Sequence, residues 1–136
     1  MINFFSEGVA MPKLDMAGIK NVLNKVILEN SFSEGEINYI FCSDTYLLSL
    51  NNEFLNHDYY TDIITFDYSE NNFVSGDVFI SLDRVQDNSA QFRCEFIDEL
   101  NRVILHGVLH MVGFDDKTDQ EKSIMREREN YYLKYI

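Results

Sequence analysis

The sequence predicts an α+β fold, in which a small mixed β-sheet of about four strands packs with about five helices. Three observations predict it: some segments repeat apolar residues at helical spacing, others alternate apolar and polar residues, and turn-forming residues separate the two kinds. A chain of 136 residues has the length of one domain and can bury a core without disulfides, so we expect a single domain over residues 1–136.

The composition is that of a folded protein with a strongly acidic charge. Hydrophobic residues make up 46% and charged residues 25%, and 23 Asp and Glu against 11 Lys and Arg give a net charge of −12. This balance excludes disorder and argues against broad, sequence-independent nucleic-acid binding, which needs a basic face. The two cysteines form no CxxC pair, and the sequence has no secretory signal and no long apolar run, so we expect a reduced, cytoplasmic protein.

The N-terminal half is expected to alternate strands and helices. Ile2–Phe5 is a short apolar run that suits an edge strand, and Pro12 suits the first position of a helix over Lys13–Glu29. Apolar residues recur at helical spacing in that helix, at Ile19, Val22, Leu23, Val26 and Ile27. After a turn, residues 37–42 alternate as a strand does, and Asp44 can cap a second helix that is rich in leucine.

The middle of the chain is expected to add two strands and two helices. Ile63–Tyr68 is rich in β-branched and aromatic residues, Asp67–Gly76 contains loop-forming residues, and Val78–Ile80 suits a short fourth strand. Asp83–Ala90 is weakly helical. A longer amphipathic helix is expected over Cys94–Val112, with the cysteine at its start buried as a small core residue.

The C-terminal segment carries two helix-boundary patterns. Gly113 stands where a helix end favours a left-handed backbone, which glycine adopts at little cost. Thr118 and Glu121 form a capping box, so a last helix is expected to begin there and run toward Tyr135. The acidic run over Asp115–Glu129 alternates with basic residues and is expected to be the solvated face of this helix. The expected order is β-α-β-α-β-β-α-α-α.

Two histidines four residues apart lie in the most helical stretch of the chain. His106 and His110 fall on one face, one turn apart, where two imidazoles can bind a single zinc ion. A third ligand must come from outside the helix, and Gly113 lets the chain turn back so that Asp116 can reach the ion; the adjacent Asp115 is the rival. Two histidines and a carboxylate form the ligand set of a catalytic zinc site with an open position, although iron, nickel and manganese suit the same donors.

Two other interpretations fit part of this pattern. A histidine on an apolar helix face is often a satisfied core residue, but the pair together with Gly113 and a carboxylate at this offset favours a metal site. The spacing is also that of zinc peptidases, which place a glutamate directly after the first histidine as general base. Gly107 stands at that position, so a peptidase is disfavoured.

Four motifs together resemble the YbeY family of bacterial rRNA maturation factors. They are HGVLHMVGFDD over His106–Asp116, TDIITF over Thr61–Phe66, GDVFIS over Gly76–Ser81 and LNN over Leu50–Asn52, in the family's order and spacing. The resemblance implies that residues 1–136 form one YbeY-like metal-binding domain, a zinc-dependent endoribonuclease that acts on single-stranded RNA. It also implies a role in 16S rRNA maturation and ribosome quality control, with ribosomal RNA of the small subunit, an Era-type GTPase and a small-subunit ribosomal protein as partners.

The sequence departs from the family pattern at two positions. The usual third ligand is a histidine, and Asp116 stands in its place; a carboxylate oxygen is an acceptable zinc ligand, but its charge should make the ion a weaker Lewis acid. The family also carries an arginine six residues before the threonine of the second motif. Here that position is Leu55, which cannot neutralise a phosphate, and His57, two residues on, could partly substitute for the arginine.

The sequence leaves the mechanism and two further residues open. A zinc-bound water, with a pKa of about 7, could attack the phosphodiester, or the metal could polarise the phosphate while the RNA 2′-hydroxyl attacks. Thr61 and Asp62 either form the turn that starts a strand or lie near the cleft. Leu55 favours one alternative function, a non-catalytic ribosome-assembly factor in which the metal is a structural staple.

Overall fold

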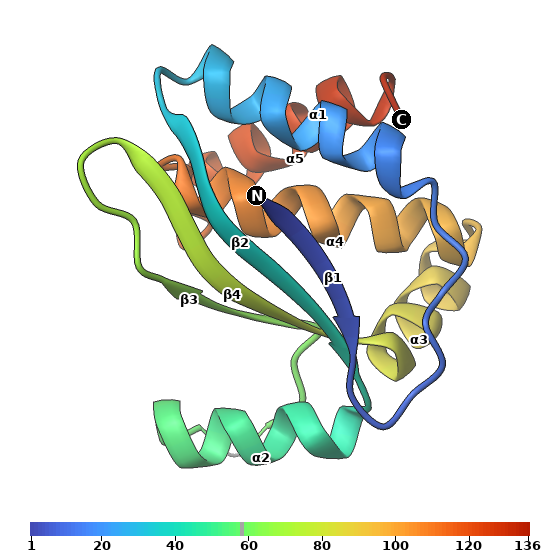
Figure 1. Cartoon of the computed structure of the whole chain (residues 1–136). Coiled ribbons are helices and arrows are strands. Elements are labelled where there is room, and N and C mark those ends of the chain that lie inside the picture. The colour runs from blue at the N-terminus through green and yellow to red at the C-terminus, as the bar shows by residue number, and fades with distance from the viewer. Residues whose placement is uncertain (58) are drawn as a thin grey trace.

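The computed structural model describes residues 1–57 and 59–136, and its elements follow the expected order (Figure 1). The strands are β1 (Ile2–Ser6), β2 (Ser33–Cys42), β3 (Ile63–Asp67) and β4 (Phe73–Ser81). The helices are α1 (Met16–Glu29), α2 (Asp44–Leu55), α3 (Leu82–Phe92), α4 (Phe96–Met111) and α5 (Asp119–Leu133). The predicted α+β class, with a small mixed sheet and five helices, is confirmed.

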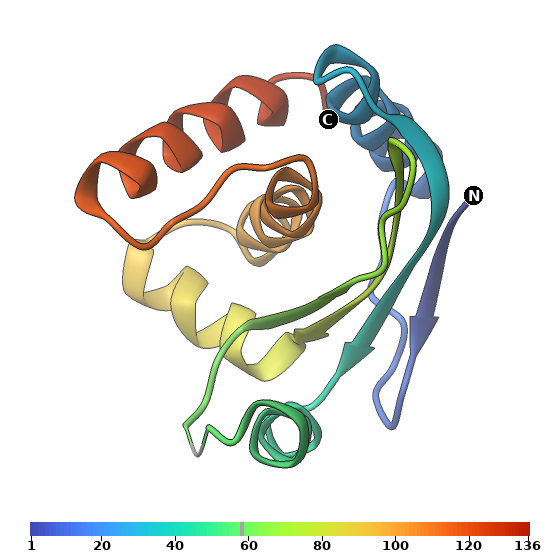
Figure 2. The same ribbon diagram turned by 90° about the vertical axis from the view of Figure 1, so that its left-hand side faces the viewer.

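The sheet is mixed because β3 runs against the other strands. The strand order is β1-β2-β4-β3, in which β1, β2 and β4 are parallel neighbours and β3 pairs antiparallel with β4 at one edge. Helices α1 and α4 lie against one face of the sheet, and α2 lies against the opposite face (Figure 1; Figure 2). Helices α3 and α5 pack on α4, so α4 is enclosed between the sheet and these two helices.

The main apolar core lies between the sheet and helices α1 and α4. Its buried residues come from the inward side of β1, β2 and β4 and from the apolar stripes of α1, α3, α4 and α5, as alternation and helical spacing predicted. The buried Tyr39 hydroxyl donates a hydrogen bond of 2.8 Å to the Ile104 carbonyl, which ties β2 to α4. In the described part of the chain, no helix is long and apolar enough to cross a membrane.

The first helix begins later than the sequence suggested. It starts at Met16 rather than Lys13, and Pro12 lies outside it, so the prediction that Pro12 opens the helix is wrong. The reason is a cap further along the chain: the Asp15 carboxylate accepts a hydrogen bond of 3.1 Å from the Gly18 N–H. The Asp15 cap gives an acceptor to a backbone N–H of the first helical turn, whereas a proline at the first position only removes one such N–H.

The loop expected before the fourth strand is shorter than predicted. Strand β4 begins at Phe73, because its first residues pair with the start of β2. Gly76 therefore lies inside the strand, where a Cβ atom would collide with the Phe66 carbonyl oxygen and lie 3.0 Å from Met111 Sδ. The glycine is needed for the close approach of β3 and α4 to β4, and not for a turn.

Three smaller expectations have mixed outcomes. Ser43 caps α2 in place of Asp44, which is the first helical residue. Cys94 is exposed rather than buried, because it lies in the connection that precedes α4. The predicted capping box is confirmed, since the Thr118 hydroxyl accepts from the Glu121 N–H and the Glu121 carboxylate accepts from the Thr118 N–H, both at 3.0 Å.

We predict that Gly76→Ala lowers the free energy of unfolding by about 1–3 kcal/mol, because the added methyl group forces β3, β4 and α4 apart. Urea denaturation followed by far-UV circular dichroism measures the change. Gly8→Ala is the control: nothing lies within 4 Å of its Cβ position, so only its positive φ is strained and the loss should be smaller. A Gly76→Ala protein as stable as the unmodified chain would contradict this packing.

Candidate metal centre

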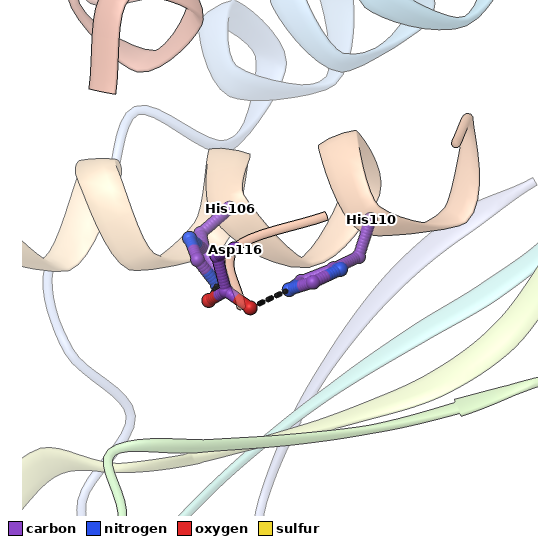
Figure 3. Close-up of side chains that lie close together, drawn as sticks. All are labelled: His106, His110 and Asp116. Atoms are coloured by element: carbon purple, nitrogen blue, oxygen red, sulfur yellow. Dashed lines mark ion pairs between the residues drawn. The ribbon is translucent and has the colours of Figure 1, made fainter. Parts of the chain in front are cut away.

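The chain that follows α4 returns a carboxylate to the two histidines of that helix. Gly113 has a φ of 107°, a left-handed conformation that turns the chain back after the helix ends. Asp116 then lies against both imidazoles, with Oδ2 3.2 Å from His106 Nε2 and Oδ1 3.4 Å from His110 Nε2 (Figure 3). One ligand atom from each of the three residues lies within 4.8 Å of the other two.

This donor set fits a small divalent metal ion. The two imidazole rings lie 4.7 Å apart at an angle of 78°, and the carboxylate approaches both Nε2 atoms from the loop. Three protein donors of this kind suit a tetrahedral ion with one position left for solvent or substrate. The rival ligand Asp115 is exposed and lines a separate small pocket of about 230 Å³, so Asp116 is the carboxylate that joins the histidines.

A buried carboxylate on α5 orients His106. Glu129 is only 4% exposed, and its Oε2 atom accepts a hydrogen bond of 2.7 Å from His106 Nδ1. With the proton on Nδ1, the Nε2 atom presents a lone pair toward Asp116, which is the form that a metal requires. Arg102 donates to Glu129 Oε1 at 3.1 Å and to the Asn130 side chain at 3.0 Å, so the carboxylate is held at both oxygens.

Glu129 corrects the expectation that the acidic run of the last helix is entirely solvated. Met125, Glu129 and Tyr132 are the buried residues of α5, and their spacing is that of one helical stripe. The sequence did contain an indication that this carboxylate is buried, because the glutamate stands between two apolar residues on one helical stripe. A buried charge at this place needs a partner, and His106 and Arg102 provide it.

Opposing effects act on the pKa of His106. Burial lowers this pKa, but the hydrogen bond and charge of Glu129, with the charges of Asp116 and Asp62, outweigh burial and raise it above its ordinary value. Burial raises the pKa of the Asp62 carboxyl, and the charges of Glu129 and Asp116 act in the same direction while His106 opposes them. The carboxylates around His106 therefore favour a cation at this place, whether a proton or a metal ion.

The metal group lies in a cleft of about 1110 Å³ that is lined by residues of β3, α3, α4 and α5. In Figure 2, α3 and α5 flank α4 on its side away from the sheet. Thr61 and Asp62 both line the cleft, and so does Leu55. His57 is not among the described residues that line it; the His57 ring stacks on Tyr59, with Nδ1 3.0 Å from the Tyr59 hydroxyl.

Gly107 has a packing role at the position where zinc peptidases place glutamate. A Cβ atom here would lie 3.0 Å from Val78 Cγ1 and 3.2 Å from Ile63 Cδ1, on strands β4 and β3. The position thus faces the sheet, and a glutamate would carry its charge into the apolar core. The site therefore offers no room for the peptidase base after its first histidine.

Comparison with known proteins finds relatives over nearly the whole chain. The family model described as Endoribonuclease YbeY matches residues 6–136. Relatives named Endoribonuclease YbeY include that of Flavobacterium psychrophilum, 50% identical over 84% of this chain and 81% of the relative, and that of Phocaeicola vulgatus, 47% identical over 100% and 99%. The solution structure of TM1509 from Thermotoga maritima is 27% identical, with a TM-score of 0.69 over 99% of this chain and 88% of that one.

We predict that Glu129→Gln weakens metal binding by about 10–100-fold, because the amide no longer supplies the charge that fixes the proton on His106 Nδ1. Competition for zinc against a chromophoric chelator measures the affinity. Glu127→Gln removes the same charge from an exposed position of the same helix and should leave the affinity unchanged. Equal losses in the two variants would show a general effect of charge and would contradict the orienting role of Glu129.

The metal-free protein should lose stability as the pH rises through the pKa of His106. Because this pKa is raised on folding, the protonated imidazole stabilises the folded state below the unfolded value of 6.5, and the contribution is lost as pH passes the folded pKa. Thermal unfolding in chelator across neutral pH measures the loss, and His106→Gln should flatten the dependence. A melting temperature that increases over the same range would contradict the raised pKa.

Proposed function

The chain belongs to the YbeY endoribonuclease family, and on this premise we propose that it is a zinc-dependent endoribonuclease that cleaves single-stranded RNA. The observation that carries the proposal is the convergence of His106, His110 and Asp116 in one cleft. A cleft of about 1110 Å³ is large enough for a nucleotide. We assign zinc because two imidazoles and a carboxylate are donors that zinc favours.

Each residue of the site has a separate task in this proposal. His106 and His110 hold the ion through imidazole nitrogens and Asp116 holds it through a carboxylate oxygen. Glu129 keeps His106 oriented, and Arg102 keeps Glu129 in place. Bound there, zinc would supply a Lewis acid for phosphodiester cleavage. Asp116 adds a negative charge to the ligand set, so it tempers that acidity relative to a set of three histidines.

We propose ribosomal RNA as the natural substrate, with 16S rRNA maturation and ribosome quality control in the cytoplasm as the process. Membership of the family supports this role. The net charge of −12 favours contact with basic partners, which suits a small-subunit ribosomal protein. An Era-type GTPase is the second partner of the same proposal.

Leu55 supports a second candidate function, a ribosome-assembly factor without catalysis. Its side chain lines the cleft at the position where the family usually carries arginine, so it offers no charge to a phosphate. In this function the metal would be a structural staple that holds the loop after α4 to the helix. Removal of the metal would then unfold the chain.

We predict that the purified protein holds about one zinc ion per chain and cleaves single-stranded RNA, and that His110→Ala loses both. Inductively coupled plasma mass spectrometry without added metal measures the zinc, and denaturing electrophoresis of labelled RNA measures cleavage. His57→Ala is the matched control for metal content, because this third histidine lies outside the metal group.

Chelation separates the two candidate functions. If chelation abolishes cleavage while the circular dichroism spectrum stays native, the nuclease is supported. If it unfolds a chain that cleaved no RNA beforehand, the structural staple is supported. A His110→Ala protein that retained zinc and cleaved RNA as the unmodified chain does would overturn the proposal.

A further inference from the structure

We propose that the cleft holds an unpaired RNA segment between two unlike walls, with phosphates on Lys122 and Arg126 and bases stacked on Tyr59 and Phe92. All four side chains line the cleft that contains the metal group. The inference rests on the proposed function, since it concerns the substrate of the same site. It assigns the selection of single-stranded RNA to the walls rather than to the metal.

The first wall is the N-terminal half of α5, and it carries exposed cations. Lys122 and Arg126 stand four residues apart, so they lie one turn apart on one side of the helix. Within the described part of the chain Lys122 has no carboxylate within 4.0 Å, and Arg126, with 54% of its side chain exposed, reaches Glu129 only at 3.8 Å. Both can therefore contact a phosphate, and Lys117 adds a third cation in the connection before α5.

These cations differ from the other cation of the cleft. Arg102 lies deeper and is already committed, since it donates to Glu129 and to Asn130. It holds the metal group together and has little capacity left for a ligand. The cleft is also lined by carboxylates, but Asp116 belongs to the metal group, and Glu99 and Glu129 are buried beside Arg102. Lys122 and Arg126 are therefore the charges on the α5 wall that an anionic ligand can contact.

The second wall comes from α3, the end of α2 and the connection between α2 and β3, and it carries exposed apolar side chains beside the polar Asn88, Thr61 and Asp62. Tyr59 is 56% exposed, Phe92 54% and Leu55 43%, although all three line the cleft. Rings this exposed add little to the core, and their faces are open for stacking. The His57 ring lies against Tyr59 with centroids 5.1 Å apart and planes at 23°, so it supports one face of Tyr59 and leaves the other for a base.

The two walls lie on either side of α4, which carries the metal-binding histidines. In Figure 2, α5 flanks one side of α4 and α3 flanks the other. A strand whose backbone follows α5 must turn its bases toward α3 and Tyr59. Only unpaired bases can do so, because the bases of a duplex are stacked on one another and paired inside the helix.

Binding rather than cleavage tests this inference. The probe is a labelled 2′-O-methyl RNA oligomer with the metal-loaded protein, measured by fluorescence anisotropy and checked for integrity by electrophoresis. Tyr59→Ala and Phe92→Ala should each weaken binding by about 5–150-fold, the effect of losing one stacked base. Lys122→Ala and Arg126→Ala should weaken binding and should each reduce the slope of log affinity against log salt by about 0.7.

A second oligomer of the same length, with sugars that lack bases, separates the two walls. Its affinity should fall with Lys122→Ala and should not respond to Tyr59→Ala. Tyr59→Phe keeps the ring and should restore binding of the base-bearing oligomer. Tyr68→Ala and Lys134→Ala are the matched controls, because both residues are exposed and neither is among the described residues that line the cleft.

Equal affinity for the single strand and for a duplex of the same sequence would overturn the inference, and so would unchanged binding in Tyr59→Ala and Lys122→Ala. The proposed function fails separately. If the protein binds the oligomers as predicted but cleaves no RNA, the proposed nuclease activity is refuted and RNA binding by the two walls is supported. If the protein cleaves RNA but all four wall variants bind the oligomer normally, the proposed nuclease activity is supported and RNA binding by the two walls is refuted.

Discussion

The hydrogen bond between Glu129 and His106 joins the metal group to the rest of the fold. The Glu129 carboxylate is buried on α5 and is shared between His106 and Arg102 on α4, so it ties the two helices at the centre of the cleft. A buried carboxylate without partners is costly, and this cost specifies how α5 docks. The same docking fixes the start of α5, and hence the preceding loop that carries Asp116, beside the imidazoles.

The close approach of α4 to the sheet is the second constraint. Gly107 lets the helix lie against Val78 and Ile63, and Gly76 accommodates the neighbouring strand and Met111. With one side of α4 fixed on the sheet, its histidines face the cleft next to β3. The candidate metal centre and the cleft thus rest on the same helix, α4, which carries the largest part of the buried core residues.

Local spacing explains what the sequence could predict. The element order follows from apolar periodicity, and the grouping of His106, His110 and Asp116 follows from a helical spacing and a glycine that ends the helix. The partner of Glu129 lies 23 residues away, and the early start of β4 depends on pairing with β2. Such contacts join segments that no short window of sequence contains. The walls of the cleft depend on such contacts too, because Tyr59, Phe92 and Lys122 come to line one cleft with the metal group only in the fold.

X-ray absorption spectroscopy at the zinc edge of the purified protein identifies the ligands directly. If His106, His110 and Asp116 hold the ion, the spectrum will show nitrogen and oxygen neighbours at about 2.0–2.2 Å, with outer scattering from two imidazoles and no sulfur. Sulfur at about 2.3 Å would place the ion on Cys42 or Cys94, and scattering from fewer than two imidazoles would exclude the α4 pair. Either result would contradict the metal centre on α4 and the nuclease that depends on it.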